Sequence, residues 1–188
     1  MSVSVLPDAP GASSWIVDYG FAGRPRPADV ATVSSSLDDV LIEELRGAQV
    51  AMGCTVEDLL LATLGRAVAR TIGEGVLRVD VVGGVGRHDV RQIGVPCVSR
   101  RGLSGPELLA AAYPTNDSSG HPSADISFAF GEGLPAHRAR SPLAVHIHPG
   151  PETTMCLQWR FDRRGFDRCT IEELAEQFPL ALIELTSG

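Results

Sequence analysis

The chain contains no lysine, and all 16 of its basic residues are arginine. This absence excludes any mechanism that needs a lysine amine, such as a Schiff base with a carbonyl substrate. The basic residues stand against 23 acidic ones, which gives a formal net charge of −7. Such a balance argues against nucleic acid or an anionic membrane as the main partner.

The four cysteines are spread along the sequence, and no two of them form a C-x-x-C pair. This spacing argues against a zinc site and against a disulfide framework. No apolar run reaches the ~20 residues that a bilayer-spanning helix needs, and the first residues lack the basic and apolar regions of a signal peptide. We therefore expect a cytoplasmic protein with neither a metal ion nor a cofactor.

The length of 188 residues and the 44% share of hydrophobic residues fit one globular domain with a sizeable core. Residues 1–30 contain four prolines and three glycines, which interrupt helices and strand ladders. We expect an extended N-terminal arm over residues 1–30 and the domain over residues 31–188. The apolar residues between Trp15 and Phe21 predict that the arm packs along the domain, in one interpretation as an edge strand.

Two helices are predicted in the first half of the domain. In SLDDVLIEELRGAQVAMG, apolar residues recur at helical spacing from Leu37 and Val40 onward, and Gly53 ends the helix. The next segment, residues 55–72, begins with a Thr–Asp capping box and has a broad apolar face, which predicts a buried central helix. Gly65 in its middle should let a neighbouring element approach closely.

Two more helices are predicted further along the chain. Ser104 and Glu107 form a capping box that predicts a short helix. Thr170 and Glu173 form another, which predicts the start of the final helix. Pro179 should kink that helix or split it in two.

Several segments are predicted to be strands. Residues 76–82 are rich in β-branched residues, residues 93–98 form a second strand interrupted by Pro96, and ADISFAFG is a third. SPLAVHIH and TTMCLQWRF are joined by the turn PGPE and form a hairpin. The resulting order of elements lacks the strict alternation of a doubly wound nucleotide-binding fold. We predict an α/β (α+β) fold, with one mixed sheet and helices packed on it.

The stretch VDVVGGVGRHD, at residues 79–89, has three glycines directly after a strand. A dinucleotide-binding loop needs G-x-G-x-x-G at the start of a helix, but Asp89 occupies the third glycine position and a strand-like segment follows. The pattern favours a tight turn over a phosphate site. Arg87, His88 and Asp89 are consecutive, so their side chains diverge and make a poor triad. Arg87 and His88 remain catalytic candidates, as does Ser127.

Motifs along most of the chain resemble the C-terminal lobe of non-ribosomal peptide synthetase condensation and epimerisation domains. The apolar helix of residues 55–71 is followed by the Val79-Asp80 strand, the glycine turn, RQIG, DISFAF and a closing hairpin and helix. That family has a Val-Asp strand, a Glu-Gly-His-Gly-Arg turn, Arg-Thr-Val-Gly and Asp-x-x-Phe-Asn-Tyr in the same order. The resemblance, from about Trp15 to the C-terminus, implies half of a chloramphenicol acetyltransferase-like two-lobed fold. In that fold, carrier-bound substrates enter a tunnel between the lobes.

The sequence departs from that family where acid/base chemistry is concerned. The family's catalytic His-His-x-x-x-Asp-Gly motif belongs to the other lobe, and this chain has no such motif. Val82 stands where epimerisation domains carry the acid/base Glu, and Ala129 and Phe130 replace the Asn-Tyr pair. Together with Trp159 of the hairpin, these residues are candidates to line a pocket. The resemblance implies a lobe that keeps the scaffold but does not form peptide bonds or epimerise by itself.

Two further groups of residues allow more than one interpretation. His146 and His148 lie on one face of a strand, as a metal pair would, but the sequence shows no third ligand. Arg160, Arg163 and Arg164 surround acidic residues, which is typical of a solvated, self-paired turn. Because carrier proteins are acidic, the same arginines are candidates to contact a carrier or its phosphopantetheine.

Three functions are compatible with these features. The chain is a non-catalytic or complementing half of a condensation-like domain in a peptide or polyketide pathway, or a pathway enzyme whose apolar pocket promotes cyclisation by shape and proximity. In the third interpretation it is one component of a carrier-dependent acyltransferase completed by a partner. A lone half would leave an apolar face wet, so we expect a homo-oligomer or a partner lobe. The expected ligand is a natural-product intermediate or a carrier protein.

Overall fold

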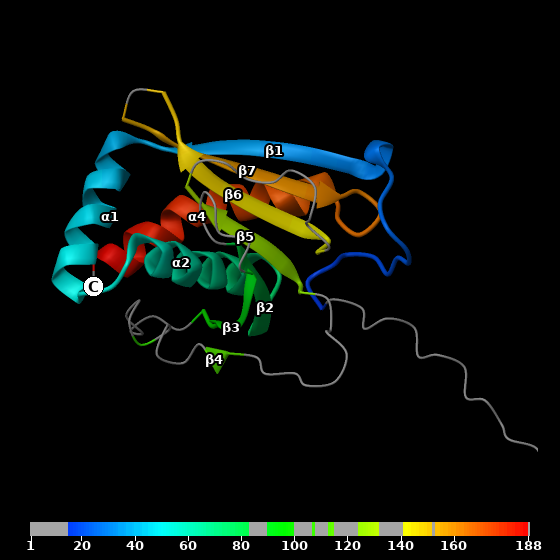
Figure 1. Cartoon of the computed structure of the whole chain (residues 1–188), viewed down its shortest axis with the longest axis horizontal. Helices are drawn as coiled ribbons and strands as arrows, with labels where there is room; N and C mark the ends of the chain where they lie inside the picture. Colours follow the sequence, from blue (N-terminus) through cyan, green and yellow to red (C-terminus); the bar gives the residue numbers. More distant parts are fainter. Residues whose placement is uncertain are drawn as a thin grey trace, which may run out of the picture.

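The computed structural model describes residues 15–82, 90–99, 107, 113–114, 124–131, 141–151 and 153–187. The described residues form a seven-stranded mixed sheet with helices packed against it (Figure 1). This arrangement confirms the predicted fold class.

The strands follow the order β1-β7-β6-β5-β2-β3-β4 across the sheet. The short strand β5 pairs in parallel with both of its neighbours, β2 and β6, and the other pairs are antiparallel. The strands are β1 (Val30–Leu37), β2 (Gly75–Val82), β3 (Val90–Cys97), β4 (Tyr113–Pro114), β5 (Ile126–Phe130), β6 (Leu143–Pro149) and β7 (Met155–Asp162). The helices are the single turn η1 (Pro27–Asp29), α1 (Asp39–Met52), α2 (Val56–Thr71) and α4 (Arg168–Thr186).

The central helix α2 begins as its sequence predicts. The Thr55 hydroxyl accepts the Asp58 N–H at 3.1 Å, and the Asp58 carboxylate accepts the Thr55 N–H at the same distance. The close approach at Gly65 is also confirmed, because a Cβ added there would lie 2.7 Å from the Pro96 carbonyl oxygen of β3. The helix therefore packs directly on the backbone of the sheet.

The edge strand β1 was not predicted from the sequence, which was interpreted as the approach to a helix. Its eight residues pair in register with β7, so distant backbone groups supply the hydrogen bonds that its serine-rich sequence does not announce. Leu37 ends this strand instead of opening α1, and Asp38 caps α1 by accepting the Leu41 N–H at 2.9 Å. Val40, expected on the apolar helix face, is 64% exposed. Gly53, by contrast, ends α1 in the left-handed region, at φ 66°, as predicted.

The final helix α4 begins at Arg168, before the predicted capping box at Thr170. Asp167 stands at the cap position but makes no side-chain cap bond, and its carboxylate accepts the Tyr19 hydroxyl at 2.6 Å. Pro179 lies inside one continuous helix, so it does not split α4 in two. Phe178 and Leu182 on either side of it are fully buried and hold both halves against the core.

The described part of the N-terminal arm packs along the domain, but residues 15–26 form no strand. Ile16 is buried in the core, and the Trp15 indole N–H donates to the Val76 carbonyl at 3.0 Å. The backbone N–H groups of Asp18 and Tyr19 donate to the Gly165 carbonyl. The rest of the arm, the glycine turn at residues 83–89 and most of the predicted short helix near Ser104 lie outside the described residues. In the part of the chain that the structure describes, no helix has both the length and the apolar character that would let it cross a bilayer.

Alternation along the strands separates a helix-covered face of the sheet from a polar face. One row across five strands is buried against the helices, and its members are Val33, Trp159, Val145, Phe128 and Val81. The Trp159 ring meets Phe178 of α4 edge-on, with centroids 5.7 Å apart. The residues between these positions point the other way. We call that side the polar face, and its members include Asp80, Val82, Gln92, Ser127, Ala129, Ala144, His146, His148, Cys156, Gln158 and Arg160.

Candidate functional site: the polar face of the sheet

Two of the four predicted pocket residues are neighbours on the polar face. Val82 of β2 and Ala129 of β5 are register partners, and His146 of β6 is the partner of Ala129 on the other side. Phe130 and Trp159 belong to the helix-covered face instead. The four candidates therefore divide between two sides of the sheet, and only Val82 and Ala129 can line the same surface.

Trp159 belongs entirely to the core. Its side chain is 0% exposed, and its indole N–H donates to the Ser35 hydroxyl at 3.2 Å. A buried tryptophan needs such a partner for its single donor. The described contacts of Trp159 thus serve the packing of β7 and β1 against α4.

Ser127, a catalytic candidate, lies on the polar face one row away from His146 and is 8% exposed. Its hydroxyl oxygen is 2.6 Å from that of Ser141, and Ser141 donates its own proton to the Leu143 carbonyl at 3.0 Å. Ser127 must then be the donor in the contact between the two hydroxyls. A hydroxyl is no base, so this arrangement does not activate Ser127 as a nucleophile.

His146 has a defined proton arrangement. Its Nε2 lies 3.0 Å from the Gly131 carbonyl oxygen, which can only accept, so Nε2 carries the proton and the neutral ring keeps its lone pair on Nδ1. Burial lowers the pKa of His146 below its usual 6.5; the Gly131 carbonyl acts in the opposite direction, and the nearby His148 lowers it further. The ring is therefore neutral at physiological pH.

His148 stands two residues further along β6, and the two ring centroids are 4.7 Å apart. Its Nδ1 donates to the Pro149 carbonyl at 2.9 Å. Cys156 of β7 is the register partner of His148. Even so, the described ranges contain no group of three or more His, Cys, Asp or Glu side chains placed to hold a metal ion.

Two aspartates complete the charged groups around β2. The Asp80 carboxylate accepts the Gln92 side-chain amide at 3.0 Å. Asp125 is 0% exposed and accepts the Arg78 guanidinium at 3.0 and 3.3 Å and the Arg78 backbone N–H at 2.9 Å. This bidentate contact ties β2 to the start of β5, so Asp125 positions the strands that carry Val82 and Ala129.

The predicted carrier-contact arginines differ in their surroundings. Arg164 donates to the Asp162 carboxylate at 3.0 and 2.7 Å and to the carbonyls of Ala22 and Gly23 at 3.3 and 3.1 Å. Although burial acts to raise the pKa of Asp162, the bonds from Arg164 outweigh it and lower that pKa. Arg164 thus fastens the arm to the domain. Arg160, on the polar face, and Arg163 are both exposed, while Arg87 and His88 lie outside the described residues.

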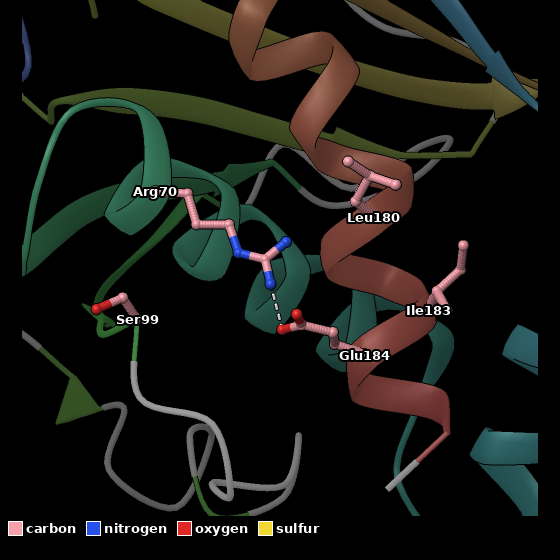
Figure 2. Close-up of a pocket in the computed structure, with 5 residues that line it drawn as sticks. All are labelled: Arg70, Ser99, Leu180, Ile183 and Glu184. Atoms are coloured by element: carbon pink, nitrogen blue, oxygen red, sulfur yellow. Dashed lines mark ion pairs between the residues drawn. The ribbon is translucent and has the colours of Figure 1, made fainter.

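A groove on the helix side escaped the sequence analysis (Figure 2). It has a volume of about 540 Å³ and lies between the ends of α2 and α4 and the segment after β3. Its lining residues are Arg70, Ser99, Leu180, Ile183 and Glu184. Arg70 and Glu184 form an ion pair, whereas Leu180 and Ile183 are 50% and 43% exposed. The spacing of these two apolar residues outside the buried stripe of α4 was the signal available in the sequence.

Comparison with solved structures places the architecture. The epimerization domain from the third module of tyrocidine synthetase B matches with a TM-score of 0.65 and 16% identity, over 98% of this chain and 52% of that one. The condensation domain of the Monacolin K polyketide synthase MokA matches with a TM-score of 0.63 and 10% identity, over 100% of this chain and 55% of that one. The fold is that of a condensation-domain lobe. The X-domain bound to OxyB from teicoplanin biosynthesis has a similar lobe, with a TM-score of 0.63 and 17% identity over 97% of this chain and 49% of that one.

Sequence comparison points to a related class of proteins. One component of the phenolphthiocerol/phthiocerol polyketide synthase of Mycobacterium tuberculosis is 26% identical over 237 aligned residues, and its counterpart from Mycobacterium bovis gives the same values. The alignment covers 93% of this chain and 16% of that synthase component. No family model matches the chain. The condensation-type lobe therefore spans about half of the solved domains it resembles and a small part of the synthase component.

Proposed function

We propose that this chain acts as one lobe of a condensation-type unit in a pathway that makes a polyketide or a non-ribosomal peptide. A second lobe, from the same polypeptide or from a partner, closes over its polar face and encloses a carrier-bound intermediate. The observation that carries the proposal is the pairing of Val82 with Ala129 on the polar face. These are the two positions at which the resemblance puts side chains that line the substrate tunnel.

The side chains of the polar face suit the wall of a channel for an acyl thioester. Val82 and Ala129 are small or apolar, so they leave room for an acyl chain beside the strands. Gln158 and Arg160 are exposed on the adjoining strand β7 and can donate to amide oxygens or to a phosphate. Arg160 and Arg163 are the carrier-facing candidates, because arginine pairs well with phosphate and with acidic protein surfaces.

The same features favour acyl transfer over cyclisation in an apolar pocket. A pocket that folds a hydrocarbon chain by shape needs an apolar lining, whereas the described part of the polar face carries Asp80, Ser127 and His146. These groups suit a polar thioester and its amide-containing pantetheine arm. A carrier-dependent acyltransferase completed by a partner is thus our more specific form of the proposal.

Titration of the ¹⁵N-labelled chain with hexanoyl-pantetheine tests this function. We expect amide shifts to change at Val82, Ala129, His146 and Gln158. Gln158→Trp should abolish these changes by filling the wall, whereas Val50→Trp, on the 83% exposed position of α1, should leave them intact. The absence of any shift, or shifts confined to Leu180 and Ile183 of the groove, would contradict the proposal.

Sedimentation velocity over a range of concentrations tests what closes the channel. A dimer that Gln158→Trp disrupts and Val50→Trp preserves would identify a second copy of this chain as the closing lobe. A monomer at all concentrations would assign that lobe to another segment or another protein. The probe-binding result is independent of either outcome.

A further inference from the structure

His146 occupies the middle of the polar face, on a strand that has neighbours on both sides. Its register partners are Ala129 of β5 and Gln158 of β7, and Val82 lies beyond Ala129. Ala129 has the smallest side chain available next to a ring, so an intermediate lying along Val82 and Ala129 would come alongside the imidazole. The ring itself is partly exposed.

We propose that His146 is the proton acceptor of this face, and that it activates an incoming amine or hydroxyl nucleophile against an acyl thioester. The inference rests on the proposed function, because it needs the thioester to lie on the polar face. It adds a catalytic residue from this lobe, at a position where the resembled family was not expected to supply one.

The hydrogen bond of His146 prepares the ring for this role. Nε2–H is held by the Gly131 carbonyl at 3.0 Å, which fixes the ring and leaves the lone pair on Nδ1. Burial keeps the pKa of His146 low, so the neutral, accepting form is present at physiological pH. A base of modest strength suits an amine or hydroxyl that loses its proton as it attacks, and it is too weak to remove a proton from carbon beforehand.

The proposed step needs no reagent beyond the two substrates. The nucleophile's nitrogen or oxygen attacks the thioester carbonyl carbon while its proton moves to Nδ1. The C–S bond then breaks, and His146 returns the proton to the departing thiolate. The products are an amide or ester and a free thiol, so atoms and electrons balance without an oxidant or a cofactor.

The other titratable groups of the described polar face are less suited to this role. Asp80 is held by Gln92 at the neighbouring row, and the Ser127 proton is given to Ser141. His148 faces the same side and lowers the pKa of His146 through its charge. Arg160 stands one row from His146 on β7 and remains protonated. His146 is therefore the group that combines a free lone pair with a place beside Ala129.

Thiol release from hexanoyl-pantetheine, by the full chain, tests the proposal. Glycinamide serves as the amine and n-propanol as the hydroxyl, and the thiol is measured with a chromogenic disulfide. The variant His146→Gln keeps an amide N–H for the Gly131 carbonyl but has no basic nitrogen. We expect it to lose about 10²-fold or more of the acceleration over buffer, together with the acidic limb of the pH–rate profile. His148→Gln is the matched control and should change the rate less than about twofold.

Two results would overturn the role of His146. One is a wild-type chain that releases thiol no faster than buffer, and the other is a His146→Gln variant with an unchanged rate and pH profile. Amide spectra of both variants establish that they are folded. If hexanoyl-pantetheine still shifts the Val82 and Ala129 amides in either case, the proposed function stands and only the inference about His146 falls. If those shifts are absent from the wild type, the proposed function itself fails.

Discussion

On β7, Trp159 is fully buried against α4, whereas its neighbours Gln158 and Arg160 point to the other side and are exposed. The same contrast holds on β5 and β6, where Phe128 and Val145 face the helices and Ala129 and His146 do not. Each strand thus serves two purposes at alternate positions. Residues of the helix-covered face hold the fold together, and residues of the polar face are available for a ligand at little cost in stability.

The largest expected effect separates the two faces at adjacent residues. Trp159→Ala should lower the free energy of unfolding by about 3–5 kcal/mol, because it removes a large core side chain and leaves a cavity beside Phe178. Gln158→Ala should change it by less than about 0.5 kcal/mol. Urea unfolding followed by circular dichroism measures both. Similar losses in the two variants would show that the polar face is as tightly packed as the core.

A pair of glycines tests how closely the helix layer fits the sheet. Gly65→Ala should cost about 1–3 kcal/mol, since the new methyl group would collide with the Pro96 carbonyl. Gly47→Ala, at a position of α1 with open space around it, should stabilise the chain by up to about 1 kcal/mol through helix propensity. Thermal unfolding of the two variants beside the wild type gives the comparison. A stable Gly65→Ala variant would mean that α2 and β3 separate easily.

The polar face should make stability depend on pH through His146. Its pKa in the folded chain lies below the usual 6.5, so the unfolded chain binds the proton more readily. The free energy of unfolding should therefore fall as the pH drops below about 6.5, until the pH passes the folded pKa. His146→Gln should flatten this part of the profile, as measured by urea unfolding at a series of pH values, whereas His148→Gln serves as the comparison. A steeper fall in His146→Gln than in the wild type would contradict the assignment.

The smallest effect concerns thiol reactivity on the two faces. Burial raises the pKa of the Cys97 thiol to about 12, so almost no thiolate is present at neutral pH. Cys156 lies on the polar face and is partly exposed. In variants that retain one cysteine each, iodoacetamide should alkylate Cys156 at least about tenfold faster than Cys97, as mass spectrometry can follow. Equal rates would indicate that the helix layer opens on the timescale of the reaction.

Several parts of the fold could be predicted because their signals are local. The Thr55–Asp58 capping box, the left-handed Gly53 and the hairpin of β6 and β7 each depend on residues a few positions apart. The start of α4 could not be predicted in this way. There, the Asp167 carboxylate is engaged by Tyr19 of the distant arm, so the capping pattern of the sequence competed with a tertiary contact.

The candidate site was predicted only in part. Strand alternation alone places Ala129 and Phe130 on opposite faces, so their separation could have been foreseen. That Phe130 and not Ala129 faces the core is a consequence of where the helices pack. His146 was noted in the sequence only as half of a metal pair. Its place beside Ala129 follows from the parallel pairing of β5 and β6, which no local pattern announces.

The sequence by itself determined the composition limits, most of the helices and strands and the resemblance to a condensation-type lobe, because these depend on neighbours along the chain. Tertiary structure decided which face of the sheet became core, that β1 joined the edge beside β7, and that Arg164 fastens the arm. The physical reason is that strand pairing and burial satisfy backbone and apolar groups from distant segments at the same time. The polar face, with Val82, Ala129 and His146 side by side, exists only once that pairing is complete.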